Sequence, residues 1–309
     1  MPYPDTAPML FGVPEIAPMN GLLILDKPQG MTSHDVVARV RKLTGERTIG
    51  HLGTLDPMAT GVLPLLLGKF TRLAQFFQQD RKRYTGSIRF GFATDTYDAE
   101  GRPVGAALEP SLTVETIRDA AHGFLGAIEQ MPPAYSAKKV DGTPAYKLAR
   151  AGAAVALRPV SIEVRRMDIL SYHAPIALFD IEVSSGGYIR SLAHDLGQQL
   201  SCGAHLASLR RIQAGDMTLE QAVTLEELGA WGSAGTIEDN LPHPRAILPQ
   251  LPAVTVDTIT AGRMRNGMAC NLPEFSQAPL VKIFTSQRDL LAIGRRIAGT
   301  LIQPMVVLG

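Results

Sequence analysis

The sequence of 309 residues has few cysteines, no long apolar run and no excess of either charge. Its two cysteines, Cys202 and Cys270, belong to no CxxC pair, which argues against a zinc site or a disulfide framework. The first 26 residues contain no Lys or Arg, and no stretch reaches the roughly 20 apolar residues that cross a membrane. We therefore expect a cytoplasmic protein without a signal peptide, a membrane segment or a metal site, whose reduced cysteines serve packing.

The sequence does contain enough apolar residues to form a sizeable hydrophobic core. At 45% hydrophobic and 19% charged, it is typical of a globular protein with one large domain or two unequal ones. The formal net charge of +1 does not indicate a nucleic-acid partner, but the charge is unevenly distributed. Residues 36–90 hold ten Lys or Arg and three Asp or Glu, a local net charge of ten minus three, or +7. This stretch is either an ordinary solvated surface or a face that follows phosphates.

Proline content and periodicity divide the first part of the chain. Residues 1–19 contain five prolines and no periodicity, so we expect a flexible N-terminal extension. Residues 22–25 read as a buried strand, and the capping-box spacing of Thr32 and Asp35 predicts that a helix begins there. Apolar residues with helical spacing follow: Val36, Val37, Val40 and Leu43. A second amphipathic helix is predicted from three inward-facing residues: Leu73, Phe76 and Phe77.

The second half of the chain contains two segments of different character. Residues 128–160 are proline-rich, basic and weakly periodic, so we expect an insertion on the surface. From residue 246 to residue 309, short strand patterns separated by turn residues suggest a small all-β module that docks on the main domain. Because strands and helices mix without strict βαβ alternation, we predict an α+β fold with a largely antiparallel sheet.

Residues 50–70, GHLGTLDPMATGVLPLLLGKF, hold a single carboxylate, that of Asp56. Asp followed by Pro and a run of small and apolar residues often begins a helix, so Asp56 is compatible with an N-cap and Pro57 with the first helical position. The local sequence favours this structural role, because capping aspartates greatly outnumber catalytic ones. The alternative is a reactive acid in a glycine-flanked loop.

Two further stretches carry candidate functional side chains. Tyr84 lies in RYTGSIRFGF, where alternation predicts a strand, so this tyrosine is compatible with simple packing on the strand face. Tyr188 and Arg190 follow two glycines where a predicted strand becomes a helix, and Arg190 either faces solvent or meets a ligand there. His51 is compatible with a turn residue, since the other histidines form no metal pattern with it.

Six segments in order resemble the bacterial TruB-type tRNA pseudouridine synthases, which isomerise uridine 55 in the T loop of tRNA. The six segments are LDKPQGMTSHD, GHLGTLDPMATGVLPLLLGKFTRLAQF, KRYTGSIRFGFATDTYDAEG, EQMPPAYSAKKVDGTPAYKLARAG, SSGGYIRSLAHDLG and CGAHLASLRR. The resemblance implies a pseudouridine-synthase-type mixed, largely antiparallel sheet flanked by helices, with residues 20–245 as the catalytic domain. Residues 246–309 resemble the family's small C-terminal RNA-binding domain, a PUA-like β-barrel, more weakly.

The resemblance also implies roles for single residues. It gives catalytic roles to three: Asp56 as the acid, Tyr84 against the target base, and Arg190 paired with the acid. It gives substrate-binding roles to four: Tyr188 and Leu209 in the base pocket, His51 near the flipped nucleotide, and Lys27, which with Pro28 braces the active-site loop. The sequence departs from the family pattern at Leu52 and Gly187, where threonine is more usual.

The implied isomerisation breaks the N1–C1′ bond of uridine and makes a C5–C1′ bond, without redox change or group transfer. We therefore expect no cofactor, and the sequence contains no phosphate loop or dinucleotide fingerprint. The reaction needs an ionised carboxylate, either as a nucleophile or as a base, and the sequence leaves both paths open. A bidentate Arg190 would favour the charged form of Asp56 and lower its pKa. Tyr84 would offset the cost of flipping the base by stacking on it.

Three other interpretations compete with this one. The first is an RNA-binding and remodelling protein, and the second is a guide-RNA-dependent synthase of the archaeal and eukaryotic type. The third is a glycosidase, which usually needs two carboxylates, whereas no second acid accompanies Asp56 in its motif. We expect a monomer that binds the T stem-loop of tRNA without a guide RNA.

Overall fold

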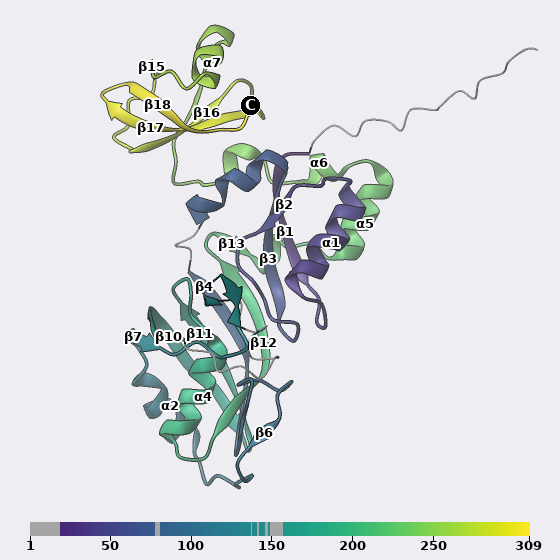
Figure 1. Cartoon of the computed structure of the whole chain (residues 1–309), viewed down its shortest axis with the longest axis vertical. Coiled ribbons are helices and arrows are strands. Elements are labelled where there is room, and N and C mark those ends of the chain that lie inside the picture. Colours follow the sequence, from purple (N-terminus) through teal and green to yellow (C-terminus); the bar gives the residue numbers. More distant parts are fainter. Residues whose placement is uncertain (1–18, 78–80, 137, 141, 146–147, 149–156) are drawn as a thin grey trace, which may run out of the picture.

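The computed structural model describes residues 19–77, 81–136, 138–140, 142–145, 148 and 157–309, arranged around two separate β-sheets (Figure 1). The predicted flexible extension lies almost wholly outside these described residues. At the first described residue, the Met19 amide donates to the buried carboxylate of Glu46 at 3.0 Å. The chain therefore enters the fold at a fixed point, directly before the first strand.

The larger sheet has nine strands in the order β1-β3-β12-β4-β11-β10-β7, with β2 paired to β3 and β13 to β12. Their bounds are β1 (Gly21–Lys27), β2 (Ile49–His51), β3 (Thr60–Leu67), β4 (Lys82–Phe90), β7 (Gly126–Gln130), β10 (Val160–His173), β11 (Ile176–Val183), β12 (Ala204–Ala214) and β13 (Met217–Thr218). All neighbours are antiparallel except β3 and β12. The predicted mixed, largely antiparallel sheet is confirmed.

The parallel contact between β3 and β12 joins the two halves of this sheet. It is short and pairs Thr60 with Arg210 and Gly61 with Arg211. Gly61 has a φ of +99°, and a Cβ there would collide with the carbonyl oxygen of Arg211, so only glycine allows this approach. Because β3 begins a few residues after Asp56, the contact brings the Asp56 loop beside β12.

Helices cover the sheet at both ends (Figure 1). They are α1 (Ser33–Thr44), α2 (Val114–His122), α4 (Ile189–Gln199), α5 (Leu225–Ala234) and α6 (Ile237–Asn240), with the 3₁₀ turns η2 (Leu219–Gln221) and η3 (Pro244–Ala246). The predicted capping box at the start of α1 is confirmed, since the side chains of Thr32 and Asp35 each bond the other's backbone N–H. α1 packs on α5, and α4 packs on β12.

One predicted helix has a different form. Residues Gly68–Phe77 form a 3₁₀ helix, η1, rather than the expected amphipathic α-helix. Leu73 is buried as predicted, whereas Phe76 and Phe77 are only partly buried, against the cluster that joins the two sheets. The tighter 3₁₀ winding shifts side chains relative to the 3.6-residue period on which the prediction rested.

The predicted insertion at residues 128–160 begins in the edge strand β7 and continues into a short hairpin, β8 (Lys139–Val140) with β9 (Thr143–Pro144). Parts of this segment lie outside the described residues. A second small hairpin, β5 (Ala93–Thr94) with β6 (Pro103–Val104), precedes α2. The turn after β5 reaches the helix α4 and contacts Arg190.

The smaller sheet forms the C-terminal part of the chain. It has the order β14-β16-β17-β18-β15 and curls into a half-barrel (Figure 1). The strands are β14 (Ala253–Thr255), β15 (Cys270–Asn271), β16 (Leu280–Phe284), β17 (Leu290–Ala298) and β18 (Leu301–Val307). The expectation of an all-β module is wrong in one respect, because Thr258–Arg265 form a helix, α7, whose N-cap Asp257 accepts from the Thr260 amide at 2.7 Å.

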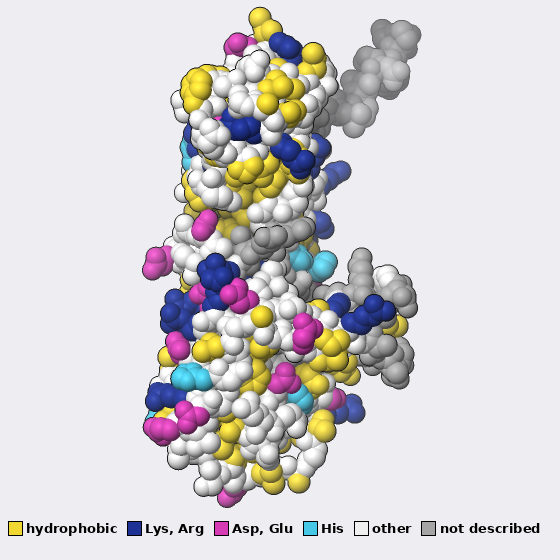
Figure 2. Space-filling model, turned by 90° about the vertical axis from the view of Figure 1, so that its left-hand side faces the viewer, with side chains coloured by type: hydrophobic (Ala, Val, Ile, Leu, Met, Phe, Trp, Pro, Cys, Tyr) yellow, Lys and Arg dark blue, Asp and Glu magenta, His cyan; other side chains and the backbone are white. Residues whose placement is uncertain are grey.

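A shared apolar cluster joins the two sheets. It contains residues of β1, β3 and η1 together with Phe284, Leu290 and Ile293 of the smaller sheet. Both cysteines are buried and unbonded, as predicted. Over the described part of the chain, no helix is long and apolar enough to cross a membrane. Figure 2 shows Lys and Arg side chains along much of one face, with most of the Asp and Glu side chains on its lower part.

Candidate active site

A cavity of about 390 Å³ collects five of the seven predicted site residues. The five are Asp56, Tyr84, Tyr188, Arg190 and Leu209. They come from the loop before β3, from β4, from the start of α4 and from β12. Four segments that are distant in sequence therefore converge on one cavity.

The Asp56 loop connects β2 to β3. No helix begins at Asp56: its carbonyl accepts from the Ala59 amide at 3.1 Å in a turn, and β3 starts at Thr60. The interpretation of Asp56 as a helix N-cap is therefore wrong, because the apolar run after it is a buried strand rather than a helix. The Asp56 carboxylate is left free to face the cavity, with 32% of its side chain exposed.

Arg190 holds the Asp56 carboxylate with two guanidinium nitrogens. Its Nη2 donates to Oδ1 at 3.1 Å, and its Nε lies 2.9 Å from Oδ2 as an ion-pair contact. Arg190 itself is only 4% exposed and sits in the first turn of α4. This bidentate arrangement fixes the plane of the carboxylate, which a lysine could not do.

A second buried carboxylate, Asp98, lies on the other side of Arg190. Its Oδ2 is 3.4 Å from Nη1, and the same nitrogen donates to the Thr96 carbonyl at 3.1 Å. The Tyr135 carbonyl accepts from Nη2 at 3.0 Å. The sequence reasoning missed Asp98, although it stands inside the quoted segment ATDTYDAEG. Asp98 does not line the cavity, so the two carboxylates do not flank a common space as a glycosidase pair would.

The pKa of Asp56 differs from the prediction. Burial raises the pKa of this carboxyl, and the Asp98 carboxylate raises it further. Arg190 and Lys27 act in the opposite direction but do not reverse the shift. The expectation of a lowered pKa is therefore wrong, because it counted one charge on Arg190 and neither the burial nor the second acid that shares that charge.

Lys27 braces the Asp56 loop through backbone carbonyls and does not line the cavity. It is completely buried at the end of β1, and its Nζ donates to the carbonyls of Pro28 at 2.9 Å, Pro57 at 3.3 Å and Ala59 at 2.7 Å. Burial lowers the pKa of Lys27 to about 8, while Asp56 opposes this shift. The carbonyls of the first and third residues after Asp56 are thus tied to the first strand of the sheet.

Arg211 bonds backbone carbonyls on either side of Asp56 in the sequence. Its completely buried side chain donates from Nε to the Val62 carbonyl at 2.6 Å and from Nη2 to the Gly53 carbonyl at 3.1 Å. It also lines the cavity, and it pairs with Tyr84 across the β4–β12 ladder. Sequence reasoning did not single out Arg211, since nothing in its local pattern distinguishes a buried arginine from an exposed one.

Tyr188 is held at the entrance to α4 by Gln130. The Tyr188 amide donates to Oε1 of Gln130 at 2.7 Å, and Nε2 of Gln130 donates back to the Tyr188 carbonyl at 2.9 Å. Gln130 is buried at the end of β7 and was also missed. Burial raises the pKa of the Tyr188 hydroxyl. Tyr84 and Leu209, both nearly buried, form the apolar side of the cavity.

His51 is the second predicted site residue, after Lys27, that does not line the cavity. It lies on β2, outside the cavity lining, with its ring edge-on to His34 at 5.6 Å between centroids. Burial and the neighbouring His34 lower its pKa. Among the described residues, no three His, Cys, Asp or Glu side chains gather in a way that could hold a metal ion.

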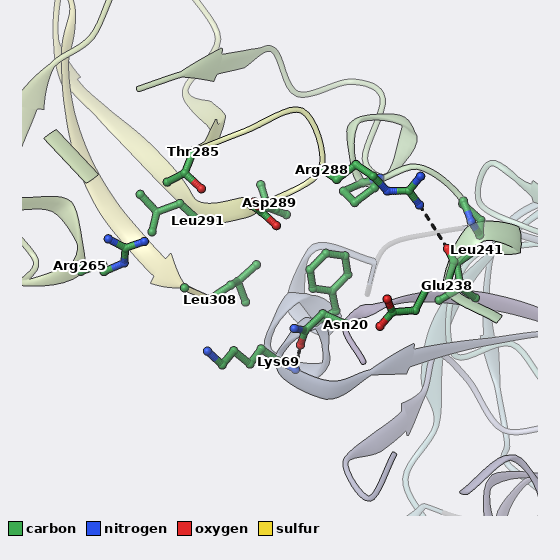
Figure 3. Close-up of a pocket in the computed structure, with 15 residues that line it drawn as sticks. Asn20, Lys69, Glu238, Leu241, Arg265, Thr285, Arg288, Asp289, Leu291 and Leu308 are labelled. Atoms are coloured by element: carbon green, nitrogen blue, oxygen red, sulfur yellow. Dashed lines mark hydrogen bonds between the residues drawn. The ribbon is translucent and has the colours of Figure 1, made fainter. Parts of the chain in front are cut away.

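A second cavity, of about 450 Å³, lies between the two sheets (Figure 3). Leu241, Leu291 and Leu308 form part of its apolar wall. The charged side chains at its edge have both signs: Lys69, Arg265, Arg288, Glu238 and Asp289. Arg288 donates to the backbone carbonyl of Glu238 at 3.2 Å, which ties the smaller sheet to α6.

Comparison with known proteins identifies the family. Residues 41–189 match the model of the TruB family pseudouridylate synthase N-terminal domain, and residues 190–249 match that of the tRNA pseudouridylate synthase B C-terminal domain. A tRNA pseudouridine synthase B of Solibacter usitatus is 44% identical over 293 residues, covering 94% of this chain and 100% of the relative. One of Aquifex aeolicus is 39% identical, covering 92% and 98%.

Solved structures agree with this assignment. The crystal structure of a Cbf5-Nop10-Gar1 complex contains a chain with a TM-score of 0.69 and 27% identity, covering 94% of this chain and 85% of that one. An H/ACA RNP bound to a substrate RNA containing 2′-deoxyuridine gives a TM-score of 0.68 at 25% identity, with the same coverage. The protein is an enzyme that belongs to the TruB family of pseudouridylate synthases.

Proposed function

We propose that this enzyme isomerises uridine 55 in the T loop of tRNA to pseudouridine, with the flipped base held in the Asp56 cavity. The observation that carries the proposal is the bidentate Arg190–Asp56 contact at the wall of a cavity lined by Tyr84, Tyr188 and Leu209. The relatives that share this chain's length are named tRNA pseudouridine synthase B, which supports tRNA as the substrate.

The catalytic residues of the proposal are Asp56, Arg190 and Tyr84. The N1–C1′ bond breaks, the base turns, C5 bonds to C1′, and the C5 proton leaves to solvent while N1 takes up a proton. Ionised Asp56 either attacks as a nucleophile or removes a proton from the sugar. In this proposal, Arg190 holds the carboxylate in one orientation throughout, and the ring of Tyr84 stacks on the base.

The substrate-binding residues of the proposal are Tyr188, Leu209, His51 and Lys27. Tyr188 and Leu209 would contact the flipped base directly, since both line the cavity. Lys27 acts through the loop carbonyls that it holds. His51 would meet RNA outside the cavity, where the extruded nucleotide leaves a gap in the T loop. Flipping costs a few kcal/mol, and one stacking contact of about 1 to 3 kcal/mol can offset much of it.

The RNA-binding surface is proposed to extend over both sheets. Residues 20–245 form the catalytic domain, and residues 246–309 form the PUA-like RNA-binding domain, with six Lys or Arg and three Asp or Glu. Within the basic stretch 36–90, Lys82 reaches the cavity, whereas Arg83 forms an ion pair with Asp180 at 2.5 Å. Binding through phosphates should weaken steeply with salt.

The test is tritium release from a tRNA transcript that carries 5-³H-uridine, with the wild type compared with Asp56→Asn at matched RNA binding. We expect release by the wild type, none by Asp56→Asn, and none from a transcript in which position 55 is cytidine. Asp119→Asn, an exposed aspartate on α2, is the matched control and should release tritium at the wild-type rate. An active Asp56→Asn variant would contradict the proposal.

The same assay separates the competing interpretations. We propose that the enzyme is a cytoplasmic monomer. We also propose that it needs no guide RNA, because its sequence identity to the bacterial relatives exceeds its identity to the H/ACA components. Activity on bare transcript supports this, whereas activity only after addition of a guide RNA would assign the enzyme to the other type. RNA binding without any release would leave a remodelling role.

A further inference from the structure

The turn that follows β5 meets the helix α4 at two points. Residues Thr96 and Asp98 contact Arg190 through a carbonyl and a carboxylate, at 3.1 and 3.4 Å. Tyr97, between them, contacts His194 instead. Because Arg190 and His194 are four residues apart on one helix, they lie on the same face, one turn from each other.

The second contact is a stack of two rings. The centroids of Tyr97 and His194 are 3.8 Å apart, and the ring planes are inclined by only 15°. No hydrogen-bond partner from the described residues reaches the buried Nδ1 of His194. His194 therefore meets Tyr97 through the face of its ring and not through a polar bond at that nitrogen.

Tyr97 adopts an unusual backbone conformation in making this contact. Its φ is +64°, a left-handed conformation that a bulky aromatic residue rarely adopts. The surrounding turn fixes the conformation: the Tyr97 carbonyl accepts from the Leu206 amide at 3.0 Å, and the Thr94 hydroxyl donates to the Asp98 carbonyl at 2.7 Å. In this conformation, the ring faces α4 while the residues on both sides face Arg190.

We propose that the stack of the Tyr97 and His194 rings is a positioning contact that fixes the 95–98 turn against α4. With the turn fixed, Thr96 and Asp98 hold Arg190 in the orientation in which it contacts Asp56. Neither ring lines the catalytic cavity, so both act through Arg190 and not on the base. The inference rests on the proposed isomerisation at Asp56. Loss of the stack lets the turn slide along the helix, and Arg190 then loses its two partners in that turn, Thr96 and Asp98.

Three variants test the proposal in the full-length enzyme. Tyr97→Gly removes the ring and relieves the backbone, Tyr97→Phe keeps the ring and the stack, and His194→Ala removes the other ring. We expect the single-turnover rate of tritium release to fall roughly ten- to a hundredfold in Tyr97→Gly and His194→Ala, because small misplacements of catalytic groups are costly. Tyr97→Phe should keep the wild-type rate and RNA affinity. So should the control Gln198→Ala, which changes an exposed residue of α4 one turn after His194.

A second readout needs no turnover. The pKa of Asp56, followed by ¹³C NMR of its carboxyl group, should rise in Tyr97→Gly, because the charge and hydrogen bond of Arg190 that lower it are lost when Arg190 leaves its orientation, and Arg190 acts more strongly on this pKa than Asp98. An unchanged rate and an unchanged Asp56 pKa in Tyr97→Gly would overturn the proposal, as would a Tyr97→Phe variant as slow as Tyr97→Gly. If Tyr97→Gly does not fold, the rate of tritium release by His194→Ala decides whether the proposal holds. An inactive wild type with a shifted pKa in Tyr97→Gly would reject the isomerisation but keep the positioning role.

Discussion

The two cavities of this protein are similar in size but differ in how charge is arranged around them. The cavity between the sheets is the larger, about 450 against 390 Å³, yet its charged side chains lie at the edge and include both signs. At the Asp56 cavity, the lining carboxylate of Asp56, the almost buried Arg190 and, behind it, the buried carboxylate of Asp98 form one continuous contact. The convergence of buried charge, more than cavity volume, distinguishes the Asp56 cavity as a candidate site from the gap between the two sheets.

The largest expected effect is that of Arg190→Lys. An ammonium cannot hold the Asp56 carboxylate at two points and also reach Asp98, so we expect the single-turnover rate to fall roughly 10²- to 10³-fold. Arg166→Lys, an exposed arginine on β10, is the matched control and should retain activity. Near-normal activity of Arg190→Lys would show that the bidentate contact is not what distinguishes this cavity.

The next effect is that of Lys27→Met, which leaves the loop carbonyls without their donor. We expect the free energy of unfolding to fall by about 1 to 3 kcal/mol and the isomerisation rate to fall with it. The same change of an exposed lysine on α1, Lys42→Met, should stay within about 0.5 kcal/mol. Chemical denaturation of both variants provides the measurement, and equal stability would contradict the bracing role of Lys27.

Lys27 also gives the stability of the protein a pH dependence. Its pKa is about 8 in the folded protein against 10.5 in the unfolded chain, so the unfolded state binds more protons between these values. Stability conferred through this group therefore rises with pH across that window. The rise should be present in the wild type and absent from Lys27→Met.

The pH profile of the reaction tests the second carboxylate. Because burial and Asp98 raise the pKa of Asp56, the acid limb of the rate should lie above the ordinary aspartate range, where Asp56 loses its charge as pH falls. Asp98→Asn removes one of these causes, so the limb should move to lower pH. A limb that stays in place would mean that Asp98 anchors Arg190 without influencing the charge on Asp56.

The smallest effect is expected in the cavity between the sheets. Lys69→Ala should leave the single-turnover rate within about twofold and the stability within about 0.5 kcal/mol, because Lys69 lies at an exposed edge. If Lys69 contacts phosphate, the slope of RNA affinity against salt decreases by about one. Loss of isomerisation in Lys69→Ala would show that the cavity between the sheets, and not only the Asp56 cavity, is needed for the reaction.

The sequence predicted those parts of the fold that depend on local pattern. The capping box at Thr32 and the alternation from Tyr84 to Phe90 each lead to the expected element, since neighbouring residues alone decide them. The form of η1 and the helix α7 were missed, because short segments balance local preference against packing.

The site was predictable only as far as the family motifs reach. Asp56 and Arg190 are brought together as the resemblance implied. Asp98, Gln130 and Arg211 were missed because their roles arise from buried contacts between segments that are distant in sequence. For the same reason the pKa of Asp56 was predicted in the wrong direction: a shift caused by burial and by a remote charge has no signature in the residues beside it.

The first strand has a role beyond pairing. Alternate residues of β1 face different clusters: Leu23 and Leu25 pack in the core of the larger sheet, and Leu22 and Ile24 pack in the cluster shared with the C-terminal sheet. The strand then ends at Lys27, which holds the Asp56 loop. The same strand therefore contacts the C-terminal sheet through its side and the Asp56 loop through its last residue, so a change in the packing of that sheet on β1 should also be felt at Asp56.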